Sequence, residues 1–160
     1  MIRQAQKEDA KRIVEIYRPY VEKTAITFAY EAPSITEMED KILSSSGRHI
    51  FLVLEIGGKI AGFAYSSVYR GRKAYEQTVE VSVYLHEEEN GKGYGRILME
   101  ELEKQMKERG AVVAIAVITS GNEKSSSAFE RMGYVFSGHL PKVGFKFGTW
   151  YGINHYYKIL

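Results

Sequence analysis

The feature that most constrains how this chain can fold is a strand, a glycine-rich turn and a helix in direct succession over residues 78–107. Residues 78–85 alternate valine or leucine with mostly polar residues, which predicts a β-strand with one apolar face. Residues 96–107 carry apolar side chains at helical spacing, which predicts an amphipathic helix that begins near Gly93 or Gly95. A helix start that follows a strand and glycines offers free N–H groups and a positive dipole end, so this stretch is suited to hold a phosphate.

Three kinds of phosphate site place glycines in such a turn, which here carries Gly91, Gly93 and Gly95. A P-loop needs Lys followed by Ser or Thr after its last glycine, whereas Arg96 follows Gly95 in this chain. A dinucleotide-binding fold puts its glycine fingerprint directly after the strand, and the spacing does not fit that pattern. The third kind is a pyrophosphate site for coenzyme A. A glycine-rich surface turn without a ligand is the remaining interpretation.

Composition excludes several classes of function. A length of 160 residues suits one domain, residues 1–160, with a substantial core. A net charge of +2 is too small to indicate nucleic acid as a partner. With no cysteine, disulfides, thiolate nucleophiles and cysteine-ligated metals are excluded, and no apolar run has the length of a signal or a membrane span. We therefore expect a cytoplasmic enzyme or binding domain without a membrane partner.

The rest of the chain mixes strand and helix patterns. Pro19 is expected to end or kink the first helix, and Ser34 with Glu37 forms a capping box at the start of the second. The order predicts an α/β fold of mixed α+β character, with a central twisted mixed β-sheet flanked by helices on both faces. The expected elements are a strand at 1–5, helices at 6–22 and 34–43, strands at 50–56, 59–68 and 78–85, a helix to about 107, a doubly buried strand at 111–117, a helix at 123–132, and strands from 134 and at 150–159.

The glycine turn, read as Asn90-Gly91-Lys92-Gly93-Tyr94-Gly95, resembles the acetyl-CoA motif of the GCN5-related N-acetyltransferases (GNAT), Gln/Arg-x-x-Gly-x-Gly/Ala. Asn90 departs from the usual Gln or Arg, while both glycines are in place. The expected element order matches the GNAT fold throughout the chain. In that fold the central strand and the next one splay apart, and the pantetheine arm of acetyl-CoA enters the gap.

Within the superfamily the chain resembles the phosphinothricin and methionine sulfoximine acetyltransferase group over nearly its whole length. The matching blocks are Ile16-Tyr17 with Thr27-Phe28, residues 70–75, residues 78–84, Gly121-Asn122 and residues 143–150. The resemblance implies a homodimer that uses acetyl-CoA to acetylate the amine of a small amino acid or amino-acid analogue, of the phosphinothricin or methionine sulfoximine/sulfone type.

The resemblance also implies roles for individual residues. The backbone of Val83, Tyr84 and Leu85 would contact acetyl-CoA, and the amide of Asn122 would bind the same cofactor. The residues expected to hold its pyrophosphate are Gly91, Lys92, Gly93, Tyr94, Gly95 and Arg96. The residues expected to face the amine substrate are Arg70, Gly71, Arg72, Glu80, Val81 and Ser82.

Three residues depart from the group's pattern. Val81 replaces a histidine that is common there, and Phe147 stands where some members carry a catalytic histidine. Gly152 stands where an aspartate usually follows the tryptophan by two residues. Because the last change affects the segment that closes the amine site, the identity of the substrate stays open.

Glu80 is the candidate general base, because it is polar in an otherwise apolar strand and partial burial would raise its pKa. A solvent-facing Glu80 is the alternative. N–H groups near Val83 and Tyr84 would stabilise the oxyanion if the strand bulges there. The group that protonates the leaving thiolate is not identified, because many relatives use a tyrosine in the helix where this chain offers Phe129.

Arg70 is expected to bind a substrate carboxylate while Glu80 faces the amine of the same molecule. The alternative is that Arg70 and Arg72 are solvated loop residues or bind the 3′-phosphate of coenzyme A. No metal site is expected, because the four histidines, His49, His86, His139 and His155, lack metal-ligand spacing.

Two other functions compete with the first. One is acetylation of a different acceptor, such as a protein N-terminus, a polyamine or an aminoglycoside, although a polycation site would need acidic groups and the loop before Glu80 is basic. The other is an acyl-CoA-binding sensor without turnover, which an intact Glu80 argues against.

Overall fold

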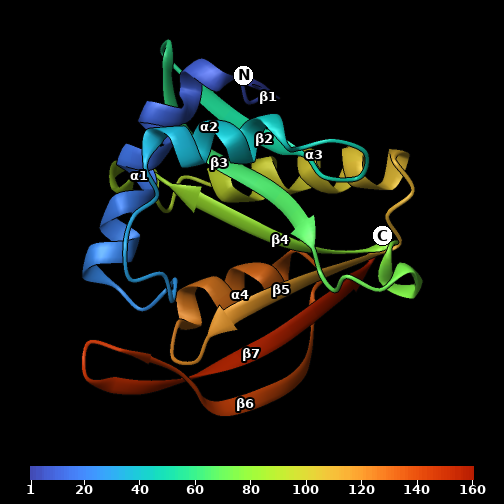
Figure 1. Ribbon diagram of the computed structural model, residues 1–160. Helices are drawn as coiled ribbons and strands as arrows, with labels where there is room; N and C mark the ends of the chain where they lie inside the picture. The colour runs from blue at the N-terminus through green and yellow to red at the C-terminus, as the bar shows by residue number, and fades with distance from the viewer.

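A computed structural model describes all residues from 1 to 160. Its centre is one seven-stranded sheet with the strand order β1-β2-β3-β4-β5-β7-β6 (Figure 1). The strands are β1 (Ile2–Gln4), β2 (Phe51–Ile56), β3 (Lys59–Val68), β4 (Thr78–Leu85), β5 (Val113–Thr119), β6 (Val135–Lys146) and β7 (Thr149–Ile159). The helices are α1 (Ala10–Lys23), α2 (Ile35–Leu43), α3 (Tyr94–Glu108) and α4 (Glu123–Arg131), with short 3₁₀ turns η1 (Lys7–Asp9), η2 (Lys73–Tyr75) and η3 (Glu87–Glu89).

The sheet is mixed because β4 and β5 run parallel while every other neighbouring pair is antiparallel. The parallel pair is short: Thr78–Glu80 lie opposite Val113–Ile115, and pairing ends there. Beyond this point the two strands diverge, as Figure 1 shows for β4 and β5. The divergence confirms the predicted splay in the middle of the sheet.

Helices cover both faces of the sheet, as the sequence predicts. On one face α3 and α4 bury Leu98, Leu102 and Phe129 against Val79 and Val81 of β4. On the opposite face α1 and α2 pack against the sheet through a second apolar cluster. Its members include Ile13, Ile16, Met38, Ile42, Phe51 and Phe63. Alternate residues of β4 therefore point toward different helices, which decides which side chains reach which side of the sheet.

Two expected boundaries are corrected by the structure. Pro19 does not end α1, which continues to Lys23, because Val21 beyond the proline is fully buried and its packing outweighs the lost N–H bond. The strand expected at 111–117 begins at Val113, and its residues alternate between buried and half-buried. It is therefore not buried equally on both faces. The capping box holds: Glu37 donates its N–H to the Ser34 hydroxyl at 3.0 Å.

The chain ends in a long hairpin of β6 and β7, whose turn contains Phe147 in a left-handed conformation with φ 51°. A buried lysine ties this hairpin to the loop after α1. The Nζ atom of Lys146 donates to the carbonyl oxygens of Val21, Thr24 and Thr27 at 2.6, 2.7 and 2.9 Å. The loop that follows α1 is thereby held near the splayed strands. None of the helices combines the length and the apolar composition needed to cross a membrane.

Candidate active site

The glycine-rich turn between β4 and α3 leaves its outer side open. Gly91 and Gly93 adopt left-handed conformations, with φ angles of 79° and 84°, which favour glycine. A Cβ atom at either position would meet no atom within 4 Å, so nothing in the chain fills the space above the turn. Because Gly93 is the N-cap of α3 and has no side chain, the first N–H groups of the helix remain free for an anion.

Two cations of this turn are already paired with neighbouring carboxylates. Lys92 donates to Glu89 at 2.9 Å, and Arg96 donates to Glu100 at 2.7 Å. The hydrogen bond from Lys92 to Glu89 is the main cause of the raised pKa of Lys92. A phosphate at the turn would therefore meet both cations together with their acidic partners.

A groove of about 490 Å³ extends from this turn toward the gap between β4 and β5. Its lining includes three basic side chains, Arg96, Lys124 and Arg131, and no acidic one. Lys124 and Arg131 of α4 form no salt bridge within the chain. The other lining residues are Tyr20, Ile26, Val83, Tyr84, Leu85, Asn90, Gly91, Gly93, Gly95, Asn122, Ser125, Ala128, Phe129 and Met132. Basic groups, open glycines and apolar walls together fit a long ligand that carries phosphates.

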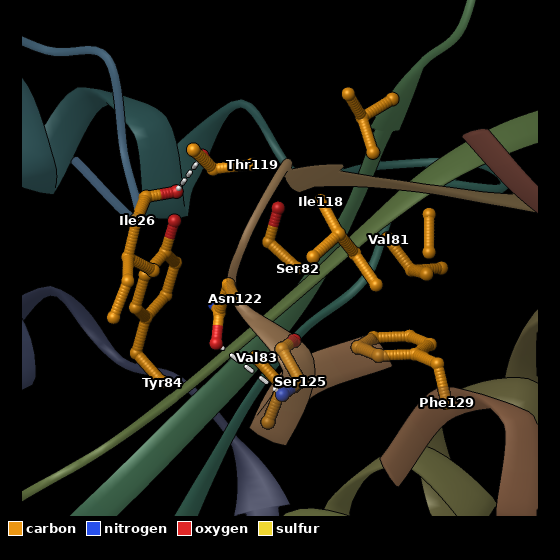
Figure 2. A pocket seen from close by; sticks show the side chains of 12 residues that line it. Ile26, Val81, Ser82, Val83, Tyr84, Ile118, Thr119, Asn122, Ser125 and Phe129 are labelled. Atoms are coloured by element: carbon orange, nitrogen blue, oxygen red, sulfur yellow. Dashed lines mark hydrogen bonds between the residues drawn. The ribbon is translucent and has the colours of Figure 1, made fainter. Parts of the chain in front are cut away.

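A smaller pocket of about 50 Å³ lies inside the gap itself (Figure 2). Figure 2 shows Ile26 and Tyr84 on one side of this pocket and Phe129 on the other, with Asn122 and Ser125 between them. Its lining residues are Ile26, Val81, Ser82, Val83, Tyr84, Ala116, Val117, Ile118, Thr119, Asn122, Ser125 and Phe129. Because six of these also line the groove, the pocket is the inner end of the same path.

The register between β3 and β4 decides which backbone groups of β4 point into the gap. Ser66 of β3 donates its N–H to the carbonyl oxygen of Ile50, on the side away from β4. The residues of β3 that exchange backbone hydrogen bonds with β4 are therefore its neighbours of the other parity, which lie opposite Glu80 and Tyr84. The backbone groups of Val83 then point away from β3 and toward β5. Since β4 pairs with β5 only as far as Glu80, the N–H of Val83 faces the gap.

From the sequence, backbone N–H groups near Val83 and Tyr84 are expected to stabilise the oxyanion only if β4 bulges there. The continuous register between β3 and β4 shows that β4 has no such bulge. The divergence of β5 exposes the Val83 N–H without one. The backbone of Tyr84 is paired with β3, so only the Tyr84 side chain reaches the gap. The Leu85 carbonyl points the same way as Val83 and accepts a hydrogen bond from the Tyr20 hydroxyl at 2.6 Å.

Glu80 is half-buried at the last pair of β4 with β5, on the face of β4 opposite to Val79 and Val81. Burial raises the pKa of Glu80, and nearby His155 lowers it by a smaller amount. Its carboxylate makes no hydrogen bond or salt bridge within the chain. The direction of this shift is the one expected for a partly buried carboxylate, and a raised pKa makes the carboxylate a stronger base.

The basic loop after β3 lies at the same end of β4 as Glu80, but the structure records no contact between Arg70 and Glu80. The guanidinium of Arg70 lies over the rings of Tyr69 and Tyr75, at 5.3 and 5.7 Å from their centroids. Arg70 and Arg72 are exposed and form no salt bridge. Their hydrogen-bond donors are therefore available to a ligand.

A family model described as "Acetyltransferase (GNAT) domain" matches residues 2–154. The chain belongs to the GNAT acetyltransferase family. It is 31% identical over 157 residues to a phosphinothricin N-acetyltransferase of Streptomyces viridochromogenes, covering 98% of this chain and 86% of that protein. It is 33% identical over 153 residues to an L-methionine sulfoximine/L-methionine sulfone acetyltransferase of Salmonella typhimurium, covering 93% and 88%. These matches confirm the resemblance drawn from the sequence.

Solved GNAT structures show the same fold. A putative acetyltransferase of Salmonella typhimurium, yncA, solved with its cofactor acetyl-CoA, superposes with a TM-score of 0.96 at 30% identity, covering 100% of this chain and 93% of that one. A ribosomal-protein-alanine N-acetyltransferase of Brucella melitensis superposes with a TM-score of 0.94 at 31% identity, covering 100% and 99%. The GNAT fold expected from the sequence is thereby confirmed.

The structure shows where the three residues that depart from the pattern of the GNAT subgroup lie. Val81 is buried in the core on the α3 and α4 face, and Phe147 is exposed at the hairpin turn. At Gly152 a Cβ atom would lie 2.6 Å from Cε1 of His139, so His139 fills the space that a side chain would need. The His139 ring is held there by a 2.7 Å hydrogen bond between its Nδ1 and the Oδ1 of Asn154.

Several side chains that line the GNAT groove were not foreseen from the sequence. They are Tyr20, Ile26, Lys124, Ser125, Ala128, Arg131 and Met132. The spacing of Lys124 and Arg131, seven residues apart in one short helix, was a usable signal because such residues share a helix face. Tyr20 gave no local signal, since it meets Leu85 across 65 positions of the chain.

Proposed function

We propose that this protein is an acetyl-CoA-dependent N-acetyltransferase that acts on the amine of a small amino acid or amino-acid analogue. The observation that carries the proposal is the position of Glu80. It is a half-buried carboxylate with a raised pKa at the end of the β4–β5 pairing, directly before the gap in which the groove ends. A base placed there can meet an amine that approaches the gap from the α1 face.

The groove would bind acetyl-CoA, which supplies the activated acetyl group. The free N–H groups after Gly93 would hold the pyrophosphate, together with Lys92, Tyr94 and Arg96. Gly91 and Gly95 keep the backbone accessible there. The backbone groups of Val83 and Leu85 would contact the pantetheine arm. The Tyr84 side chain and the Asn122 amide would lie beside the same arm.

Glu80 would accept the proton that the amine loses when its nitrogen attacks the acyl carbon, either directly or through one water. The N–H of Val83 would donate to the carbonyl oxygen as that oxygen gains negative charge. Both groups are fixed by strand pairing, Glu80 by its place opposite Ile115 and Val83 by its register with β3. Such preorganised groups need little rearrangement during the reaction.

The basic loop would select an acceptor that carries a carboxylate. Arg70 has its donors free, and its guanidinium is braced by two aromatic rings. It would bind the carboxylate while Glu80 takes the amine, with Gly71, Arg72 and Ser82 around the acceptor. Val81 was also expected to face the acceptor, but it is buried in the core on the opposite face of β4 and reaches only the gap pocket. A relative that acetylates phosphinothricin, which is an amino-acid analogue, supports this class of acceptor.

A second candidate acceptor is the N-terminus of a protein, since the similar Brucella melitensis structure is a ribosomal-protein-alanine N-acetyltransferase. A peptide has an amide where a free amino acid has its carboxylate, so it cannot offer the same charged partner to Arg70. The basic loop therefore favours the free amino acid or its analogue.

We also propose a homodimer in which β6 takes part, because β6 is an edge strand of the sheet. Large apolar side chains are exposed along this hairpin, namely Val135, Phe136, Leu140, Val143, Phe145 and Trp150. A monomer rarely leaves such a row on a free edge, and a second copy of the chain would cover it. Sedimentation analysis of wild type and Phe136→Glu tests this, with a shift to monomer expected in the variant.

A thiol-release screen with acetyl-CoA tests the acceptor directly. The panel should hold common amino acids, phosphinothricin, methionine sulfoximine and sulfone, decarboxylated amines, polyamines and short peptides with N-terminal alanine. Turnover is expected to be highest with an amino acid or analogue. Higher kcat/KM for a decarboxylated amine than for its parent amino acid would contradict the proposal, and a preference for the peptides would favour the second candidate.

A further inference from the structure

Cleavage of a thioester leaves negative charge on sulfur, and a donor at that atom would lower the barrier. The two groups already assigned do not supply it, since Glu80 accepts a proton and Val83 faces the carbonyl oxygen. The position on α4 where a tyrosine would serve is taken by Phe129, which lines both the groove and the gap pocket. A phenyl ring has no polar hydrogen, so the donor must come from elsewhere.

A ligand that reaches the gap must pass the junction of the groove and the gap pocket. With the Val83 N–H assigned to the carbonyl oxygen, the side chains with a polar hydrogen are the remaining candidates there. The residues that line both cavities are Ile26, Val83, Tyr84, Asn122, Ser125 and Phe129. Of these six, Tyr84, Asn122 and Ser125 carry a polar hydrogen on the side chain.

The contacts of these three side chains show which one has a free donor on the α4 side of the pocket. The ring of Tyr84 packs against Tyr17 and Tyr20, with centroids 5.0 and 5.2 Å away, so it reaches the gap from the α1 side, across the pocket from Phe129 (Figure 2). Asn122 is the N-cap of α4, where its Oδ1 accepts the N–H of Ser125 at 3.3 Å, and its amide is already assigned to the pantetheine arm. The hydroxyl of Ser125 has no hydrogen-bond partner within the chain, and Figure 2 shows this residue at the pocket.

The helix fixes where Ser125 points. It is the third residue of α4, and Phe129 lies one turn further on the same side of the helix. Ser126 and Ser127 follow it directly but line neither cavity. Only Ser125 of the three consecutive serines therefore faces the path of the ligand, near the positive end of the helix dipole.

We propose that the hydroxyl of Ser125 donates a hydrogen bond to the sulfur of the acyl donor as the carbon–sulfur bond breaks. When the amine nitrogen bonds to the acyl carbon it loses one proton to Glu80, and the electron pair of the carbon–sulfur bond goes to sulfur. Ser125 keeps its own proton, and solvent supplies the proton that turns the thiolate into a thiol. This inference rests on the proposed acetyl transfer from acetyl-CoA.

The test compares Ser125→Ala with the matched control Ser126→Ala. Turnover of Ser125→Ala is expected to fall about ten- to a hundredfold, because a hydrogen bond to a charged atom is lost, while the acetyl-CoA Kd changes by less than about threefold. Ser126→Ala should match wild type. Ser125→Thr, which keeps a hydroxyl, should recover most of the lost turnover.

A second readout needs no acceptor: the pKa of the coenzyme A thiol bound to the enzyme, followed by thiolate absorbance in the ultraviolet. Wild type should lower this pKa by about one unit or more relative to free coenzyme A, and Ser125→Ala should remove most of that shift. Equal thiol pKa values in wild type and Ser125→Ala would overturn the assignment. If no amine is turned over, the proposed function fails, yet the titration still decides the role of Ser125.

Discussion

Glu80 and Ile115 form the last residue pair between β4 and β5, and the strands separate from the next residue onward. The next residues, Val81 and Ala116, already line the gap pocket. The carboxylate is therefore fixed by strand pairing at the edge of an opening that begins one residue later. The position of the proposed base and the opening proposed for the acyl group both follow from this single change in pairing.

The pyrophosphate site can be tested by filling its space without straining the turn. Gly95 lines the groove in the first turn of α3, and an added Cβ would meet only Leu85 Cδ1 at 3.8 Å. Gly95→Val should raise the acetyl-CoA Kd at least about tenfold, or about 1.4 kcal/mol, by calorimetry, and Gly95→Ala should raise it less. Gly93 is a poorer target, because its φ of 84° strains any side chain. Wild-type affinity in a folded Gly95→Val variant would remove the cofactor assignment.

The unpaired cations of α4 are expected to bind a phosphate of the cofactor. Lys124→Ala and Arg131→Ala should each weaken acetyl-CoA binding about three- to tenfold and make the affinity less sensitive to salt, since exposed charge pairs are screened. Lys104→Ala, an exposed lysine of α3 outside the groove, is the matched control. If all three variants bind alike across a salt series, α4 does not take part in phosphate binding.

Arg70 is expected to affect the acceptor and not the cofactor. Arg70→Ala should raise KM for carboxylate-bearing acceptors roughly tenfold or more, because a charged hydrogen bond is worth about 1.5–3 kcal/mol. Arg70→Lys should also lose activity, since an ammonium cannot make the paired planar contact. KM for acetyl-CoA should stay constant, and Lys73→Ala in the same loop serves as control. An unchanged acceptor KM in Arg70→Ala would make Arg70 a solvated loop residue.

Local patterns of the sequence predict much of the fold. Alternation in β4, the glycines before α3 and the Ser34–Glu37 capping box each depend on neighbours in the chain, and the structure contains all three. Pro19 shows the limit of such reasoning, because the burial of Val21 is a tertiary effect that local propensity cannot register.

The site depends on contacts that are distant in sequence, and these were less predictable. Which N–H of β4 faces the gap follows from its register with β3, and no property of the strand itself separates Val83 from Tyr84. Likewise the sequence shows only that Gly152 stands where the related group carries an aspartate. The structure shows that His139 occupies the space that a side chain at position 152 would need. The contact between Gly152 and His139 joins two neighbouring strands, and local sequence patterns do not reveal it.

Glu80 also links activity to stability. Burial raises its pKa, so the folded state is penalised whenever Glu80 is ionised. This penalty is absent below the usual glutamate pKa of about 4.3 and grows as pH rises through the raised value. Glu80→Gln is therefore expected to have a higher Tm than wild type at pH 7 and no such advantage at about pH 4. A lower Tm at pH 7 would show that ionised Glu80 stabilises the fold instead.

The pH dependence of kcat/KM for the acceptor, measured in wild type and Glu80→Gln, tests whether Glu80 is the base for acetyl transfer. Wild type should show an acidic limb with an apparent pKa above the usual glutamate value. Glu80→Gln should lose about 10²–10⁴ in rate together with that limb, while its acetyl-CoA Kd is unchanged. Glu80→Gln with the wild-type rate and the same acidic limb would show that Glu80 is not the base.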